Sequence, residues 1–118
     1  MSYLEARFGF EPLPVHRLLP QFLGGTPLEV PESYEAGSPR SHIRKNCPPT
    51  LLLQGLHDFS GVAPEVRGVY AELKKAGCTA FLFELPDTDH GFDLYFPKWS
   101  PAARAATYVT ERFLAYLS

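Results

Sequence analysis

The chain has 118 residues, 45% of them apolar and 14% aromatic, which suits one globular domain with a real core and argues against disorder. Its formal net charge is −2, so no basic field indicates a nucleic-acid or anionic-membrane partner. No apolar run is long enough to cross a bilayer, no secretory pattern is visible, and two isolated cysteines, Cys47 and Cys78, suit a reducing compartment, so we expect a cytoplasmic protein.

The first 49 residues are interpreted as a proline-rich arm. Five prolines and the pair Gly24-Gly25 interrupt residues 1–35. Proline fixes φ and removes a backbone donor, so long helices and central strands are not expected there. One short helix is expected over residues 15–23, where apolar side chains recur at helical spacing. The sequence thus predicts an irregular arm with a short helix over residues 1–49.

Residues 50–118 follow a strand–helix–strand–helix pattern. Residues 50–54 and 79–84 are apolar on both faces, which is typical of buried parallel strands. From Pro64 onward, apolar side chains recur at steps of three and four residues, which indicates a helix. This helix is expected to stop at Ala76-Gly77, because glycine can take the left-handed cap conformation. Together these elements predict an α/β unit with a parallel sheet.

The last predicted helix begins at Ser100-Pro101. Serine is a favoured N-cap residue, and proline suits the first helical position. The buried stripe of this helix is expected to contain six apolar residues: Ala102, Ala105, Ala106, Val109, Phe113 and Leu117. Cys78, just before the second strand, is expected to serve as a small buried apolar group.

Two polar loops leave the carboxyl ends of the predicted strands. His57-Asp58 follows the first strand, and His90 follows the second in a loop that also contains Asp87, Asp89 and Asp93. A strand–helix–strand unit makes two parallel neighbours through a right-handed crossover. Working groups gather at the carboxyl ends of such strands. We therefore expect the two loops to meet and to form one site.

The carboxylates around His90 also invite a metal interpretation. In a calcium loop that starts at Asp87, glycine and glutamate are required at the sixth and twelfth positions, but Phe92 and Lys98 occupy them. A zinc site built from His57, Asp58 and His90 is conceivable but is not favoured. No metal or other cofactor is therefore expected.

Several stretches, taken in chain order, resemble one known family. They are 22–27 (FLGGTP) with Tyr34 and Ser38-Pro39, 48–58 (PPTLLLQGLHD), 70–77 (YAELKKAG) and 90–93 (HGFD). With this spacing the chain resembles the C-terminal part of an α/β-hydrolase of the esterase, lipase or carboxylesterase type. The resemblance covers nearly everything after Phe22 and implies a fragment of a parallel α/β sheet that hydrolyses esters in the parent fold.

In that family the catalytic triad runs in the chain order serine, acid, histidine. By position, the resemblance assigns Asp58 of a Gly-x-x-Asp motif as the acid and His90 of a His-Gly-Phe motif as the base. The carboxylate would accept a hydrogen bond from one ring nitrogen of His90, and the other nitrogen would take the proton of the nucleophile. The resemblance also implies a small ester as the substrate, and His57 is then a bystander.

The nucleophile has no counterpart in the sequence. Neither a Gly-x-Ser-x-Gly motif nor a His-Gly-Gly oxyanion loop occurs, and Ser38 and Ser60 lack the flanking glycine pattern. A Phe-Ser-Gly-Val run follows Asp58, where the family usually has a valine–proline pair. We therefore expect little or no hydrolysis by this chain alone.

Three descriptions of the chain stay open. Residues 1–118 are a single partial hydrolase domain, a non-catalytic module that assembles with itself, or one subunit of a split hydrolase. Two parallel strands leave two open sheet edges, and such sheets normally occur in larger assemblies. We therefore expect either a homo-oligomer or pairing with a missing N-terminal half.

Overall fold

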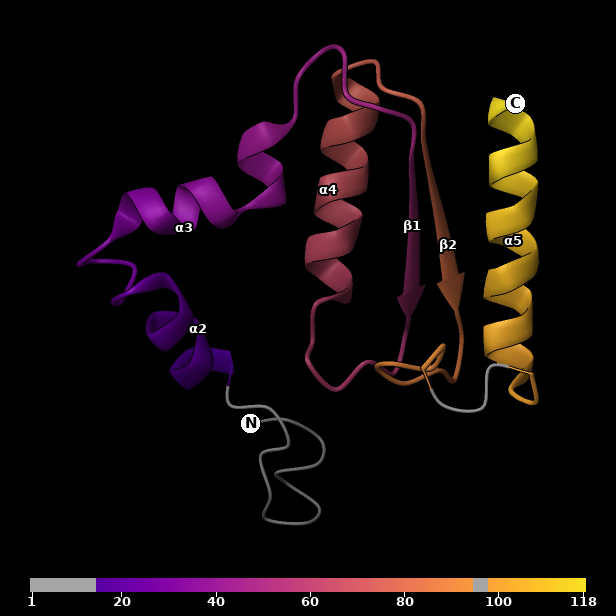
Figure 1. Ribbon diagram of the computed structural model, residues 1–118, viewed down its shortest axis with the longest axis horizontal. Helices are drawn as coiled ribbons and strands as arrows, with labels where there is room; N and C mark the ends of the chain where they lie inside the picture. The colour runs from indigo at the N-terminus through magenta and orange to yellow at the C-terminus, as the bar shows by residue number, and fades with distance from the viewer. Residues whose placement is uncertain (1–14, 95–97) are drawn as a thin grey trace.

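The computed structural model describes residues 15–94 and 98–118, and its centre is a sheet of two parallel strands (Figure 1). β1 (Thr50–Gly55) pairs with β2 (Ala80–Leu85) in register, so that Thr50 lies opposite Ala80. α4 (Ala63–Lys75) contacts both strands on one face of the sheet, and α5 (Pro101–Leu117) contacts both on the other. The predicted parallel sheet and the order strand, helix, strand, helix are therefore confirmed.

The core lies between α4 and the sheet. Leu73, Cys78 and Ala80 are its buried members, and the side chains packed around them include Leu52 and Val69. Burying one leucine side chain stabilises a fold by about 1.5–3 kcal/mol, so Leu73 is a main contributor on this face. Cys78 is only 6% exposed, which confirms its expected burial, and its thiol donates to the Arg44 carbonyl at 3.2 Å.

α4 begins and ends as its sequence predicts. Pro64 occupies its first turn, where the missing backbone donor costs nothing. At the other end Gly77 has φ +79°. The amide of Gly77 donates to the carbonyl of Lys74, and the amide of Cys78 donates to that of Leu73, both at 3.0 Å. These two bonds satisfy carbonyls that the end of the helix would otherwise leave unpaired, and they turn the chain directly into β2.

α5 is capped as expected, but its buried face is only partly the predicted one. The Ser100 hydroxyl accepts a hydrogen bond from the amide of Ala103 at 3.3 Å. Ala103 and Ala106 are buried, whereas Leu117 is 44% exposed. Ala103 was not in the predicted stripe, and Leu117 was placed there wrongly. Leu117 lies in the last turn, where helix ends are commonly open to solvent.

In the part of the arm that the structure describes, residues 15–49, helices occur in three short pieces. α2 (Val15–Leu23) confirms the expected short helix. The prediction did not include α3 (Pro31–Gly37) or η1 (Pro39–His42), a 3₁₀ helix. Both begin with proline, which breaks helices in their interior but starts them well, and this explains the omission. The part of the arm before residue 15 lies outside the described residues.

One arginine ties the arm to the rest of the fold. Arg40 of η1 bonds to Glu72 of α4 and forms an ion pair with Glu65 at 3.3 Å. These groups are exposed, so the pairs position η1 more than they stabilise it. Of the helices that the structure describes, none has both the length and the apolar character required to cross a bilayer.

Candidate active site

Asp58 lies in a tight turn directly after β1. The amide of Ser60 donates to Asp58 Oδ1 at 2.9 Å, and the amide of Gly61 donates to the Asp58 carbonyl at 3.1 Å. Gly61 has φ +71°, a conformation that favours glycine. The turn thereby fixes the Asp58 side chain at the carboxyl end of the sheet, before α4 begins at Ala63.

The loop after β2 carries His90 and is bound to the end of β1. The amide of His57 donates to the Thr88 carbonyl at 3.0 Å, and the amide of Leu56 donates to the Leu85 carbonyl at 2.9 Å. Thr88 is itself buried, and its hydroxyl donates to the Pro86 carbonyl at 2.8 Å. The two polar loops therefore meet, as the topology predicted.

Gly55 makes this contact possible. A Cβ at this position would overlap the Thr88 carbonyl oxygen and would lie 3.0 Å from the Asp89 carbonyl oxygen. Both atoms belong to the backbone that leads to His90, so neither can move without moving the loop. The last residue of β1 must therefore be glycine for His90 to approach Asp58 this closely.

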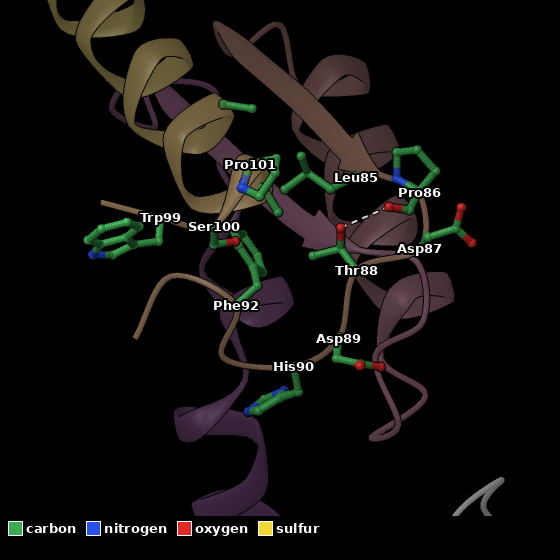
Figure 2. Close-up of a pocket in the computed structure, with 12 residues that line it drawn as sticks. Leu85, Pro86, Asp87, Thr88, Asp89, His90, Phe92, Trp99, Ser100 and Pro101 are labelled. Atoms are coloured by element: carbon green, nitrogen blue, oxygen red, sulfur yellow. Dashed lines mark hydrogen bonds between the residues drawn. The ribbon is translucent and has the colours of Figure 1, made fainter. Parts of the chain in front are cut away.

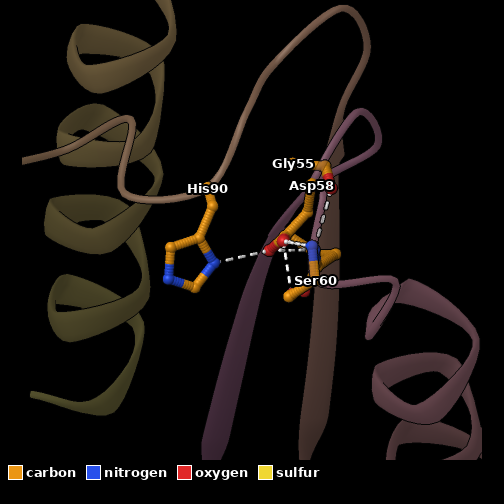
Figure 3. Close-up of polar contacts among 5 residues, drawn as sticks. Gly55, Asp58, Ser60 and His90 are labelled. Carbon is orange, nitrogen blue, oxygen red and sulfur yellow. Dashed lines mark hydrogen bonds and ion pairs between the residues drawn. The ribbon is translucent and has the colours of Figure 1, made fainter. Parts of the chain in front are cut away.

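The structure brings Asp58 and His90 together (Figure 3). Asp58 Oδ2 lies 3.0 Å from His90 Nδ1. The Asp58 side chain is 8% exposed and that of His90 is 47% exposed. The ring of Phe59 lies against the imidazole, with centroids 5.3 Å apart. A buried carboxylate thus holds one nitrogen of a half-exposed imidazole ring.

Two further residues hold Asp58, and neither was among the site residues that the sequence predicted. The hydroxyl of Ser60 donates to Asp58 Oδ1. The side-chain amide of Gln54 donates to Asp58 Oδ2 at 3.2 Å. Gln54 is 5% exposed at the end of an apolar strand. A polar side chain at such a position was the one signal that could have found it, because buried polar groups need partners.

The surroundings of Asp58 decide its charge. Burial raises the pKa of its carboxyl, but the hydrogen bonds from Ser60, His90 and Gln54 favour the charged form, and the net pKa lies below the ordinary value of 3.8. Asp58 is therefore ionised at neutral pH and can only accept hydrogen bonds. It follows that Nδ1 of His90 carries the proton, and in the neutral ring Nε2 offers a lone pair.

The other polar groups of the two loops lie apart from this pair. His57 Nε2 is 3.6 Å from Asp87 Oδ1, with both side chains largely exposed. Asp89 and Asp93 are also exposed. Within residues 15–94 and 98–118, no group of three or more His, Cys, Asp or Glu side chains is arranged to hold a metal ion.

A cleft of about 830 Å³ adjoins His90 (Figure 2). Its walls come from the end of β2, the loop that carries His90, and the first turns of α5. Most lining side chains are apolar: Leu85, Pro86, Phe92, Trp99, Pro101, Ala102 and Ala105. His90 thus combines a carboxylate partner with a place in the wall of an apolar cleft.

Several known proteins are similar to this chain in sequence or in fold. Residues 17–118 match the prolyl oligopeptidase family. The chain belongs to that family. It is 34% identical over 87 residues to the probable carboxylic ester hydrolase LipM of Mycobacterium tuberculosis (strain ATCC 25618 / H37Rv). It is also similar to the thermophilic esterase Est2 of the Planctomycetes species Thermogutta terrifontis, with a TM-score of 0.70 to both the propionate-bound form (25% identity) and the native form (26%).

The matches to LipM and Est2 cover most of this member of the prolyl oligopeptidase family but only part of each relative. The LipM match covers 71% of this chain and 19% of LipM. The Est2 matches cover 95% of this chain and 38% of the Est2 chain. The chain therefore spans less than half the length of either relative. Because LipM is named a probable carboxylic ester hydrolase and the esterase Est2 shares the fold, the expected relation to an esterase-type α/β-hydrolase is confirmed.

Proposed function

We propose that Asp58 and His90 are the acid and the base of a serine carboxylic ester hydrolase. The observation that carries this proposal is the 3.0 Å contact between buried Asp58 Oδ2 and His90 Nδ1. This is the geometry by which a carboxylate fixes the tautomer of a catalytic histidine. Membership of the prolyl oligopeptidase family and similarity to LipM and Est2 support the reaction class.

The pair would act through Nε2 of His90. That nitrogen takes the proton of the serine hydroxyl as the serine oxygen forms a bond to the ester carbonyl carbon, and it later gives this proton to the leaving alcohol. In the second half, Nε2 takes a proton from water, which attacks the acyl ester, and returns it to the serine oxygen. Asp58 keeps its charge throughout and stabilises the imidazolium.

The nucleophilic serine is expected to come from outside these 118 residues. No Gly-x-Ser-x-Gly motif occurs in the 118 residues. We propose that it belongs to a preceding segment of the same polypeptide or to a second subunit. The substrate class is a small carboxylic ester, which is supported by the propionate-bound form of Est2 and by the apolar cleft next to His90.

Hydrolysis of an aryl ester tests this proposal. The chain alone is expected to give no turnover above that of free imidazole. The joined hydrolase is this chain fused to a segment in which a strand, a Gly-x-Ser-x-Gly turn and a helix follow one another. Turnover is expected of it, and His90→Ala is expected to lower its kcat by about 10⁴-fold or more. His57→Ala is the matched control, since its neighbouring imidazole points at Asp87, and it should leave kcat within about twofold.

Two results would count against the proposal. One is robust turnover by the chain alone that survives in His90→Ala. The other is equal activity of His90→Ala and His57→Ala in the joined protein. If the chain alone turned over ester and lost this activity in His90→Ala, the acid and base roles would stand, and only the external serine would be wrong.

A second candidate, a self-assembling module, is favoured by the apolar side of β2 and α5. Phe81 is 43% and Tyr116 68% exposed, and they frame a hollow of about 310 Å³ together with Phe113. Self-association over this surface would cover it. If the chain is such a module, sedimentation should show a dimer that Tyr116→Lys weakens about tenfold or more, whereas Leu28→Lys on the arm does not. A monomer at high concentration would contradict assembly.

We also propose a cytoplasmic location. Cys47 and Cys78 are both free thiols, and this supports a reducing compartment. Cell fractionation tests it: recovery in the secreted fraction would contradict the proposal.

A further inference from the structure

We propose that Gln54 and Ser60 are positioning residues that hold Asp58 with its Oδ2 oxygen toward His90. The inference rests on the proposed function, because it concerns the acid of the same pair. Neither residue touches the ring of His90 through a hydrogen bond in the described structure, so each acts through Asp58.

Ser60 holds one carboxylate oxygen. Its amide donates to Asp58 Oδ1 at 2.9 Å, and its hydroxyl donates to the same oxygen. Both donors belong to the residue two positions along the chain, and the turn fixes the position of the amide donor. The carboxylate cannot rotate about its Cβ–Cγ bond without losing both bonds.

Gln54 holds the other oxygen. One N–H of its side-chain amide donates to Asp58 Oδ2 at 3.2 Å, and its Nε2 also bonds to the Gly55 carbonyl at 2.8 Å. An unpaired amide buried to this extent would be costly, so the second bond keeps the first in place. Asp58 Oδ2 is therefore shared by a buried amide and the imidazole of His90.

The four hydrogen bonds fill the lone-pair positions of the carboxylate. The Asp58 side chain is 8% exposed. Hydrogen bonds to the charged form stabilise that form. Gln54 and Ser60 thereby keep Asp58 an ionised acceptor of one orientation, which sets the proton of His90 on Nδ1.

The test is nuclear magnetic resonance of the 118-residue chain, which needs no turnover. Carbon-13 detection follows the Asp58 carboxyl, and nitrogen-15 shifts report which ring nitrogen of neutral His90 carries the proton. In Ser60→Ala and Gln54→Met we expect the pKa of Asp58 to rise and the Nδ1–H fraction to fall. Ser60→Thr, which keeps the hydroxyl, should restore both.

The controls separate this inference from the proposed function. Ser41→Ala, on exposed η1, should change neither readout. If Ser60→Ala and Gln54→Met leave both readouts unchanged while Asp58→Asn moves the His90 ring, the inference is wrong and the acid–base pair stands. If Asp58→Asn also leaves the His90 ring unchanged, the proposed acid–base pair of Asp58 and His90 is wrong. Should Gln54→Met not fold, Ser60→Ala decides alone, since it keeps the turn amide in place.

Kinetics of the joined hydrolase give an independent readout. Ser60→Ala and Gln54→Met are each expected to lower kcat about tenfold with KM unchanged. Each weakens the hold on Asp58, whose charge stabilises the His90 imidazolium as it forms. A rise in KM with unchanged kcat would instead indicate a role in substrate binding and would overturn the positioning role.

Discussion

Asp58 is the residue at which burial and hydrogen bonding oppose each other, and hydrogen bonding prevails. Burial raises the pKa of its carboxyl, and the bonds from Ser60, His90 and Gln54 lower it further than burial raises it. The result is a buried charge that is fully paired. A group of this kind links the stability of the fold to pH.

The first prediction concerns acid stability. Because the folded-state pKa of Asp58 lies below the ordinary 3.8, the stabilisation it gives is present above that value and is lost as the pH falls through the folded-state pKa. Urea unfolding below about pH 4 should therefore show a steeper loss of stability in the wild type than in Asp58→Asn, by at most about 1.4 kcal/mol per pH unit. Parallel profiles would mean that Asp58 titrates alike in both states.

Gly55 affects the contact between Asp58 and His90 because it leaves room for the loop that carries His90. Gly55→Ala is expected to destabilise the fold by about 1–3 kcal/mol, because its methyl group would displace the carbonyls of Thr88 and Asp89. The displaced loop should also lengthen the contact between His90 and Asp58. Thermal unfolding and the nitrogen-15 shifts of His90 measure the two effects.

Gly37→Ala is the matched control for Gly55→Ala. Its added methyl group would lie 3.7 Å from the nearest side-chain atom, which is ordinary contact. Equal effects of the two substitutions would show that the loop does not depend on the close approach at Gly55.

At the scale of elements, the same change, glycine to alanine, should have opposite effects at two positions of α4 and its cap. Gly68 lies inside the helix, and the nearest atom to an added Cβ is 3.6 Å away on Arg40, so Gly68→Ala should stabilise the fold by about 0.5–1 kcal/mol. Gly77 has φ +79°, so Gly77→Ala should destabilise it by about 1–2 kcal/mol. Changes of the same sign in chemical denaturation would contradict this description of the helix and its cap.

The elements also mark how far the sequence could be interpreted. Apolar runs, a proline after a serine, and a glycine after a helical stripe are local signals, so β1, β2, α4 and α5 were predictable with ends within about two residues. α3 was missed because proline at a helix start looks the same in sequence as proline that interrupts a helix.

The contacts of the site were likewise only partly predictable from the sequence. The meeting of Asp58 and His90 follows from parallel strands and their carboxyl ends, which are properties of topology. The contacts from Gln54 and Ser60 depend on side-chain directions inside one turn, and sequence periodicity carries no information about them. The buried face of α5 was partly wrong for a similar reason, since helical spacing gives a stripe but not how far along it the sheet extends.

On the scale of the whole molecule, residues 15–94 and 98–118 form a sheet of two strands with helices on both faces and an apolar side on β2 and α5. Phe81 contacts Phe113 and Tyr116 edge-on there, at centroid distances of 5.9 and 5.7 Å. A surface of this kind suits contact with further protein, whether a longer hydrolase or another copy. The chain spans only part of LipM and Est2, which supports our proposal that it works within a longer hydrolase.

The most direct test of the central claim is the tautomer of neutral His90, measured by nitrogen-15 resonance in the wild type, Asp58→Asn and Asp89→Asn. Asp89 is next to His90 in sequence, whereas Asp58 is 32 residues away and 3.0 Å distant. We predict a proton on Nδ1 in the wild type and in Asp89→Asn, and loss of this preference in Asp58→Asn. A wild-type ring with its proton on Nε2, or a tautomer that follows Asp89 instead, would contradict the acid–base pair.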